Sequence, residues 1–375
     1  MNPGRKLSDR MGPIVIKLGS SVVARDDGSM RVDVLDRICA DVAELRSAGQ
    51  EVIIVSSGAI ARGFGAIGVA PAQRPRGISY LQAASAVGQG KVYRVYDDLL
   101  SARGVHSAQV LLTFFDLSTR VPYLNVRRTL ERLLEWGVVP VINENDTTTT
   151  DEISFGDNDF LAAQVAVLMG ARRLLLLTNT DGLYDSDPRE SRSARLISTV
   201  STPEELEALQ IGAGTSALGS GGMRSKVTAA EMATAAGIPV VIANGQRPGT
   251  VAELARGQLT GTSFEPQPRR VSSFKLWLRY AKPVRGAVEV DAGAAQALRE
   301  GGGSLLPVGV VGTSGDFEAG DAVAVLVGEE LVGKGISNYG AEELRQVRGL
   351  KSARIRELMP EAADEVVHRD YFVLA

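Results

Sequence analysis

The stretch PIVIKLGSS, residues 13–21, indicates the fold class most directly. Its first six residues are apolar on both faces except at Lys17, which is typical of a strand buried in a parallel sheet. Residues 33–45 then carry apolar side chains at helical spacing, and this pattern stops at Gly49. EVIIV, residues 51–55, is predicted to be the next buried strand. This succession of strand, helix and strand favours an α/β fold.

The same alternation continues through the first 260 residues. Further helices are predicted at residues 78–103, 119–136, 157–169 and 223–236, and further strands at 108–112, 138–142, 174–177 and 238–242. Alternating strands and helices predict an α/β/α sandwich around a mainly parallel central sheet. We expect residues 1–260 to form this domain.

The pattern changes after residue 260. GTSFEPQPRR, residues 261–270, contains two prolines and is predicted to be a linker. A helical segment at 272–280 then precedes short strands, which are expected at 287–290, 305–311, 322–327 and 331–336. We therefore expect a second, small and mostly β domain over residues 271–375.

The scarcity of cysteine and histidine restricts the possible chemistry. The 375 residues include one cysteine, Cys39, which can form neither an internal disulfide nor a CxxC zinc pair. Two histidines, His106 and His368, leave little room for a histidine-built metal site. Lys, Asp, Asn, Ser and backbone amides must then carry any catalysis. Phosphoryl transfer suits such groups, because it depends on positioning and charge more than on a titrating base.

Net charge and hydropathy argue against a polyanionic or membrane partner. The formal net charge of −3 provides no global attraction to nucleic acid or to an anionic membrane. Residues 1–13 lack the apolar core of a signal peptide, and no run of 18 apolar residues could span a bilayer. Together with the single cysteine, these features predict a cytoplasmic protein.

Polar groups follow the first two predicted strands. Lys17 ends the first strand, and the turn at residues 19–21 offers N–H groups and hydroxyls to an anion. SSGAI, residues 56–60, follows the second strand and can accept a carboxylate or phosphate. Ligands of open α/β sheets bind outside the carboxyl ends of the strands. A lysine that merely reaches solvent, and an ordinary tight turn, are the alternatives.

The densest polar cluster is NEND, residues 143–146, with DEISFGDND, residues 151–159. Acidic residues at a helix start contribute roughly 0.3–1 kcal/mol, so capping explains one or two of residues 157–159. Capping does not explain NEND after a buried strand. We predict a polar pocket in which asparagine amides hold a substrate. A carboxylate there would orient nearby lysines or receive an ammonium group.

Two later segments suit a phosphate-bearing ligand. SGGMRSK, residues 220–226, places cations at the start of a helix, and a bound anion would relieve their conflict with the helix dipole. LLLLTNTDGLY, residues 174–184, ends a buried strand with Thr178 and Asn179, which suit a base or ribose, although a plain turn is the alternative. Two lysines, Lys17 and Lys226, facing one pocket would neutralise a transferring phosphoryl group.

The GxGxxG match GFGAIG, residues 63–68, is a weak signal. Pro71 and Pro75 follow it where a dinucleotide-binding helix would be needed, and no acidic residue lies near position 83. We interpret the match as a flexible glycine-rich loop.

In combination, the motifs resemble the amino acid kinase family, and within it the bacterial enzymes that phosphorylate L-glutamate. The matching segments, in order, are IVIKLGSS, VIIVSSGAIA, LQAASAVGQG, VVPVINEND, FGDND, LLLLTNTDGLY and LGSGGMRSK. GGSLLPVGV and GKGISNYGAEELRQVRG resemble a PUA domain. The resemblance implies transfer of the ATP γ-phosphoryl group to the side-chain carboxylate of L-glutamate. L-Glutamyl 5-phosphate would be the product, in the first step of proline synthesis.

The resemblance also assigns roles to individual residues. Lys17 and Lys226 would stabilise the transferring group, and Asp159 would hold both lysines in position. The glutamate-binding residues would be Ser57, Asn143, Asp146, Asp157 and Asn158. ATP would be bound by Lys17, Thr178, Asn179, Ser220, Gly221, Gly222, Met223, Arg224, Ser225 and Lys226. Mg²⁺ would be held mainly by the phosphates and not by a protein metal site. Because the acceptor carboxylate is already ionised at pH 7, no general base is required.

Asn179 stands where many relatives have Asp, and Ser154 stands where relatives often have Lys. The fine detail of ATP contact at Asn179, and any role of the lysine at position 154, therefore do not transfer. The resemblance further implies inhibition by proline, a homodimer or homotetramer, and association with the next enzyme of the pathway.

Two alternative functions stay open at this point. Family members that act on aspartate, carbamate or acetylglutamate share the chemistry, but the C-terminal domain argues against them. PUA domains also occur in RNA-modifying enzymes, yet residues 271–375 hold 12 basic and 15 acidic side chains. A local basic run is interpreted as a solvated helix face: Arg345, Arg348, Lys351, Arg354 and Arg356.

Overall fold

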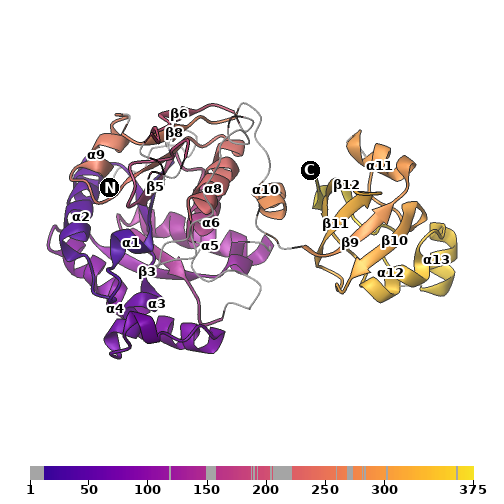
Figure 1. Cartoon of the computed structure of the whole chain (residues 1–375), viewed down its shortest axis with the longest axis horizontal. Helices are drawn as coiled ribbons and strands as arrows, with labels where there is room; N and C mark the ends of the chain where they lie inside the picture. Colours follow the sequence, from indigo (N-terminus) through magenta and orange to yellow (C-terminus); the bar gives the residue numbers. More distant parts are fainter. Residues whose placement is uncertain are drawn as a thin grey trace. The chain divides into compact units, whose positions relative to one another are not determined.

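The computed structural model divides into two compact units, Met1–Arg270 and Val271–Ala375 (Figure 1). It describes residues 12–117, 120–148, 158–186, 188, 191, 193–202, 205, 222–258, 260–267, 273–280, 282, 284–300, 303–359 and 362–375. None of the described helices is both long and apolar enough to cross a bilayer.

The first unit is built on one sheet, whose described strands run in the order β3-β4-β2-β1-β5-β7-β8-β6. Their bounds are β1 Ile14–Leu18, β2 Val52–Val55, β3 Ser107–Leu112, β4 Val139–Glu144, β5 Arg173–Thr178, β6 Thr199–Val200, β7 Val240–Asn244 and β8 Thr262–Phe264. The strands from β3 to β7 in this order are all parallel, whereas β8 runs antiparallel to β7. The predicted mainly parallel sheet is confirmed. β8 occupies part of the stretch predicted to be a linker, where it pairs with both β7 and β6.

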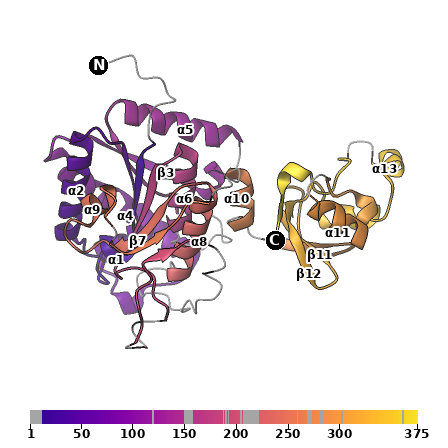
Figure 2. The same cartoon turned by 90° about the horizontal axis from the view of Figure 1, so that it is seen from above.

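Helices cover both faces of this sheet. They are α1 Ser20–Val23, α2 Val32–Ser47, α3 Ala59–Ala66, α4 Ile78–Ser101, α5 Arg120–Glu135, α6 Asn158–Met169, α8 Met223–Ala235 and α9 Thr250–Ala255, with short 3₁₀ turns at Pro71–Gln73 and Phe114–Leu117. Figure 2 shows α2 and α9 on one side of the sheet and α6 and α8 on the other. Ile14, Ile16 and Leu18 share a buried cluster with residues of α2, α4 and α9. Because side chains alternate along a strand, Lys17 faces the opposite side, where α6 packs on β1.

The GFGAIG match has a structural explanation that the sequence analysis did not find. Gly63 and Gly65 lie inside α3, so the interpretation as a flexible loop is wrong. A Cβ at Gly63 would lie 1.7 Å from the Ala84 carbonyl oxygen, and one at Gly88 would lie 1.8 Å from that of Ala59. Glycine therefore allows the backbones of α3 and α4 to touch, and this contact positions the loop between the two helices.

The second unit is a five-stranded sheet of order β10-β9-β11-β12-β13 with helices around it. Its elements are α10 Ser273–Tyr280, β9 Val284–Val290, α11 Ala292–Arg299, β10 Val310–Gly315, β11 Ala322–Val327, β12 Glu330–Ile336, α12 Ala341–Val347, α13 Ser352–Leu358 and β13 Phe372–Leu374, with 3₁₀ turns at Pro307–Gly309 and Arg369–Tyr371. The strand predicted at 305–311 is misplaced. Leu305 forms an isolated bridge with Val367. A 3₁₀ turn occupies Pro307–Gly309, so β10 begins at Val310.

Three of the five residues in the basic run of the second unit pair with carboxylates. Arg345 lies 2.8 Å from Glu342, Arg354 2.5 Å from Glu357, and Arg356 2.8 Å from Asp364, measured between nitrogen and oxygen. Exposed pairs of this kind add little to stability, about 0–1 kcal/mol each. They offset part of the local positive charge, which supports the interpretation of a solvated face.

Candidate active site

Polar residues from five neighbouring strands meet at the carboxyl edge of the first sheet. Lys17 lies near the end of β1, the central member of this group. Ser56 and Ser57 follow β2, and Asn143 lies near the end of β4, on one side of β1. Thr178 ends β5 on the other side, and the next strand, β7, ends at Asn244. The edge therefore has two halves that join at Lys17, as expected for a ligand site of an open parallel sheet.

A three-residue ionic cluster occupies the junction. Lys17 Nζ lies 2.6 Å from Asp159 Oδ1, and Lys226 Nζ donates to Asp159 Oδ2 at 3.0 Å. Asp159 comes from the first turn of α6 and Lys226 from the first turn of α8. Ser225 also donates its hydroxyl to Asp159 Oδ2, at 2.9 Å. The structure thus brings together the three predicted catalytic residues, all of which are buried.

The protonation state of this cluster follows from its geometry. Burial by itself raises the pKa of Asp159, but the ammonium groups of Lys17 and Lys226 outweigh that effect and hold the pKa well below its usual value. Asp159 is therefore ionised throughout the physiological range. One carboxylate between two lysines leaves a net positive charge, which is suited to an anionic phosphoryl group.

A buried chain of amides lies beside the cluster, on the β2–β4 side. Asn158 donates to the Asn143 side-chain oxygen at 2.7 Å and to the Ser56 carbonyl at 2.6 Å. Asn143 in turn donates to Gln89 Oε1 at 2.8 Å. Gln89 donates to the Glu144 carbonyl at 2.8 Å, and its contact with Ser85 measures 3.2 Å. Each amide is oriented by its neighbours, so the chain presents a fixed polar wall.

Asp146 is the terminal member of this chain. The Ser85 hydroxyl donates to its Oδ2 at 2.5 Å, and the described residues provide Asp146 with no salt-bridge partner. Burial raises the pKa of Asp146 to about 6, although the Ser85 hydrogen bond opposes the shift. Asp146 is thus a buried carboxylate that a positively charged ligand would stabilise.

The two serines after β2 contribute differently to the site. The Ser56 hydroxyl is turned toward the Tyr96 hydroxyl, 3.0 Å away, in the buried interior. Ser57 faces the cavity described below, and its Oγ lies 3.4 Å from Asn158 Nδ2. Gly58 follows at φ +89°, a left-handed conformation that suits glycine and turns the chain into α3.

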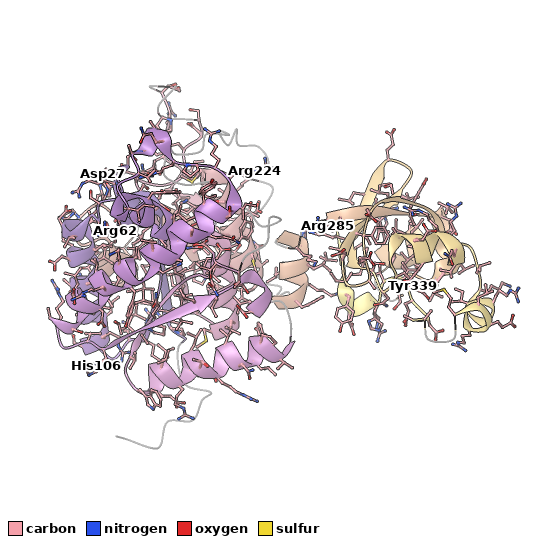
Figure 3. The ribbon with its side chains drawn as sticks, turned by 90° about the horizontal axis from the view of Figure 1, so that it is seen from below. Asp27, Arg62, His106, Arg224, Arg285 and Tyr339 are labelled. Carbon is pink, nitrogen blue, oxygen red and sulfur yellow. The ribbon has the colours of Figure 1, made fainter. Side chains whose placement is uncertain are left out.

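The half of the edge formed by β5 and β7 is less enclosed. Thr178 is buried, whereas Asn179 is exposed and accepts a weak hydrogen bond from the Thr178 hydroxyl at 3.4 Å. Asn244 donates to Asp181 Oδ1 at 3.0 Å and connects the ends of β5 and β7. At the start of α8, Ser225 and Lys226 face Asp159, whereas Arg224 is exposed (Figure 3). Arg224 does not join the ionic cluster.

A cavity of about 580 Å³ lies on the β2–β4 side. Its lining includes four of the residues predicted to bind glutamate: Ser57, Asn143, Asp146 and Asn158. Asp157, Ser220 and Gly221, and also Ser154, lie outside the described residues. Within the described ranges, no group of three or more His, Cys, Asp or Glu side chains could hold a metal ion by itself.

Sequence reasoning missed Ser85, Gln89 and Asn244 as members of the site. Ser85 and Gln89 are four residues apart and therefore share one face of α4, which points at β4. Polar residues at that spacing in a mostly apolar segment were the available signal. Asn244 gave a second signal, because it is polar at the end of a buried strand.

The chain is similar to known proteins over most of its length. The model of the amino acid kinase family matches residues 12–244, and that of the PUA domain matches residues 286–359. A glutamate 5-kinase of Synechococcus sp. (strain JA-3-3Ab) is 45% identical over 366 residues, which cover 97% of this chain and 98% of the relative. That of Thermoanaerobacter sp. (strain X514) is 41% identical over 364 residues, or 96% and 97% of the two chains. A UMP kinase structure from Bacillus anthracis aligns with a TM-score of 0.48 at 17% identity, over 68% of this chain and 96% of that one.

Proposed function

The chain belongs to the amino acid kinase family, and on that premise we propose that it transfers the γ-phosphoryl group of ATP to the side-chain carboxylate of L-glutamate. The product, L-glutamyl 5-phosphate, enters proline synthesis. The observation that carries the proposal is the Lys17–Asp159–Lys226 cluster between an acceptor pocket and a nucleotide edge. Its two lysines, Lys17 on β1 and Lys226 on α8, can contact one phosphoryl group.

In the proposed reaction, a γ-carboxylate oxygen of glutamate attacks the γ-phosphorus of ATP. The bond from that phosphorus to the β,γ-bridging oxygen breaks, and ADP leaves with the electron pair. No proton is transferred, because the acceptor is already ionised. Lys17 and Lys226 stabilise the charge on the phosphoryl oxygens, while Asp159 fixes both ammonium groups. Mg²⁺ bound to the phosphates of ATP neutralises part of their charge.

The acceptor pocket suits the ammonium group of glutamate. Asp146 supplies a buried carboxylate, and the Asn158 side-chain oxygen is buried with no donor from the described residues. Both line the same cavity. An ammonium group there would satisfy two acceptors that are otherwise costly to bury.

A direct assay tests the proposed activity. Purified protein with ATP, Mg²⁺ and L-glutamate should release ADP and form an acyl phosphate that hydroxylamine traps. L-Aspartate and N-acetylglutamate serve as competing acceptors. Turnover with either of them, and none with L-glutamate, would contradict the proposal.

Removal of one lysine tests the role of the cluster. Lys226→Ala should lower kcat by about 10²-fold, by analogy with the loss of one donor to a developing oxyanion. Lys91→Ala is the matched control, because Lys91 is an exposed lysine on α4. A Lys226→Ala enzyme with the kcat of the wild type would exclude the assigned role.

Finer features of the function are predictions of the same proposal. Proline carries a carboxylate beside a cationic nitrogen, so it should compete with glutamate at Asp146. A homodimer or homotetramer, association with the next enzyme of the pathway, and a cytoplasmic location are also expected. The other predicted glutamate and ATP contacts, including Asp157, Thr178, Asn179 and the 220–226 segment, are proposed on the family resemblance.

A further inference from the structure

L-Glutamate carries three charged groups, and the proposed function names a side-chain partner in the pocket for two of them. In the proposed function the γ-carboxylate faces the two lysines, and the α-ammonium group faces Asp146. The α-carboxylate also enters the cavity, and burying a carboxylate without a cation or several donors is costly. A pocket that selects glutamate is therefore expected to offer a cation, or several hydrogen-bond donors, at this position.

Two arginines are the cations that the described lining of the cavity contains. Arg74 and Arg76 line it together with Ser57, Asn143 and Asp146. Both belong to the loop between α3 and α4, and the contacts described for Arg74 are with a backbone carbonyl and an aromatic ring, not with a carboxylate. Their positive charge is thus available to a ligand carboxylate.

Arg74 is the better placed of the two, because two contacts restrict its side chain. Its Nη2 donates to the Asp26 carbonyl at 2.6 Å, and its guanidinium lies 5.8 Å from the centre of the Phe64 ring. Pro71 and Pro75 flank it in the sequence and limit the backbone of the loop. Arg76, by contrast, is exposed.

The supporting segments are themselves well packed. A Cβ at Gly28 would lie 2.2 Å from the Ala61 carbonyl oxygen, so the turn at residues 25–29 touches the backbone of α3. Figure 3 shows Asp27 and Arg62 on these two neighbouring segments. The Asp26 carbonyl of the turn and the Phe64 ring of α3 therefore contact the Arg74 guanidinium from two well-packed segments.

The Nε of Arg74 is buried and has no hydrogen-bond partner among the described residues. A guanidinium can bind a carboxylate through two parallel N–H groups, which lysine cannot do. A buried, unsatisfied N–H beside a substrate cavity is costly unless a ligand accepts from it.

We propose that Arg74 binds the α-carboxylate of L-glutamate and so selects an α-amino acid over other compounds that carry a similar carboxylate. The inference rests on the proposed function. It makes Arg74 a specificity-determining residue of the acceptor pocket that has no part in stabilising the phosphoryl group.

Kinetics with two acceptors test the proposal. L-Glutamate is compared with its α-amide, which keeps the size of the α-carboxylate but lacks its charge. The wild type should prefer L-glutamate in kcat/KM, and Arg74→Leu should reduce that preference by about 10- to 100-fold, the range of a charged hydrogen bond. The loss should lie in KM for glutamate, with KM for ATP unchanged. Arg74→Lys should restore part of the preference.

The outcomes separate this inference from the proposed function. If the wild type does not phosphorylate L-glutamate, the proposed function fails first. If it does, and Arg74→Leu lowers kcat/KM equally for both acceptors, Arg74 only supports the loop and the inference is wrong. A rise in KM for ATP would place the guanidinium on the nucleotide instead. Arg76→Leu is the control variant. If it lost more of the preference for L-glutamate over the α-amide than Arg74→Leu does, the assignment to Arg74 would also be wrong.

Discussion

Asp159 and Asp146 are two buried carboxylates of one site, and their surroundings shift their pKa values in opposite directions. Asp159 contacts two lysines and a serine hydroxyl, whereas Asp146 receives a hydrogen bond from Ser85 and no cation from the described residues. The pKa of Asp159 is held below its usual value, while that of Asp146 is raised to about 6. Burial therefore does not determine ionisation by itself; the nearest charges do.

Asp159 already has ionic partners in the structure, whereas the charge of Asp146 could pair with a substrate. Asp159 is satisfied before any ligand arrives, so it can hold Lys17 and Lys226 in place during turnover. Asp146 is incompletely satisfied and gains most when an ammonium group enters. In the proposed function, the preorganised cluster would stabilise the transferring group and Asp146 would bind the acceptor.

The largest expected difference between the two carboxylates is in stability. Asp159→Asn leaves two lysines without their counter-ion, and breaking a buried pair in this way costs about 3–5 kcal/mol. Asp146→Asn removes a charge that burial already disfavours, so the free energy of unfolding at pH 7 should stay equal or rise. Urea unfolding of both variants measures this. Equal losses of stability would show that the two environments do not differ as described.

The sign of the Asp146 effect on stability follows from its raised pKa. The folded state favours the protonated form, so any gain from Asp146→Asn is present at pH 7 and shrinks as pH falls below about 6. It should vanish near the unfolded-state pKa of about 3.9. Unfolding curves between pH 7 and pH 4 would show this convergence, and a gain that grew toward acid would contradict the assignment.

A smaller effect should appear in the binding of the acceptor. Only ionised Asp146 can pair with the α-ammonium group, so KM for glutamate should rise up to about tenfold per pH unit below about pH 6. KM for ATP serves as the internal control for the stability of the protein at acid pH. A flat KM for glutamate between pH 7 and pH 5 would remove Asp146 from the ammonium site.

The smallest change is expected from Ser85→Ala. Loss of the hydroxyl removes a hydrogen bond that favours the ionised form, so the pKa of Asp146 should rise further. The midpoint of the KM profile would then move to higher pH, by about half a unit to one unit for a hydrogen bond of ~1 kcal/mol. Ser79→Ala, on the same helix and outside this network, is the control. A shift to lower pH would contradict the proposed role of Ser85.

Much of the fold and of the site could be predicted because the signals are local. Each buried strand is a mostly apolar run, and the functional residues lie at or near its carboxyl end, as with Lys17, Asn143 and Thr178. The carboxyl ends of parallel strands lie at the same edge, so their gathering follows from the fold class alone. Short elements such as β6, β8 and β13 were missed, because two or three residues carry no periodicity.

Sequence alone therefore determined the chemical classes present: two lysines, an orienting aspartate, and amides at strand ends. Only the tertiary structure decided which face of a strand or helix meets which neighbour. It showed that Ser85 and Gln89 of α4 contact Asp146 and β4. It also showed that Gly63, in the GFGAIG match, lies in a close contact between two helices and not in a loop. It also placed Arg74 in the lining of the same cavity as Asn143 and Asp146. These contacts join residues distant in the chain, and their energies depend on burial and distance, which no local pattern records.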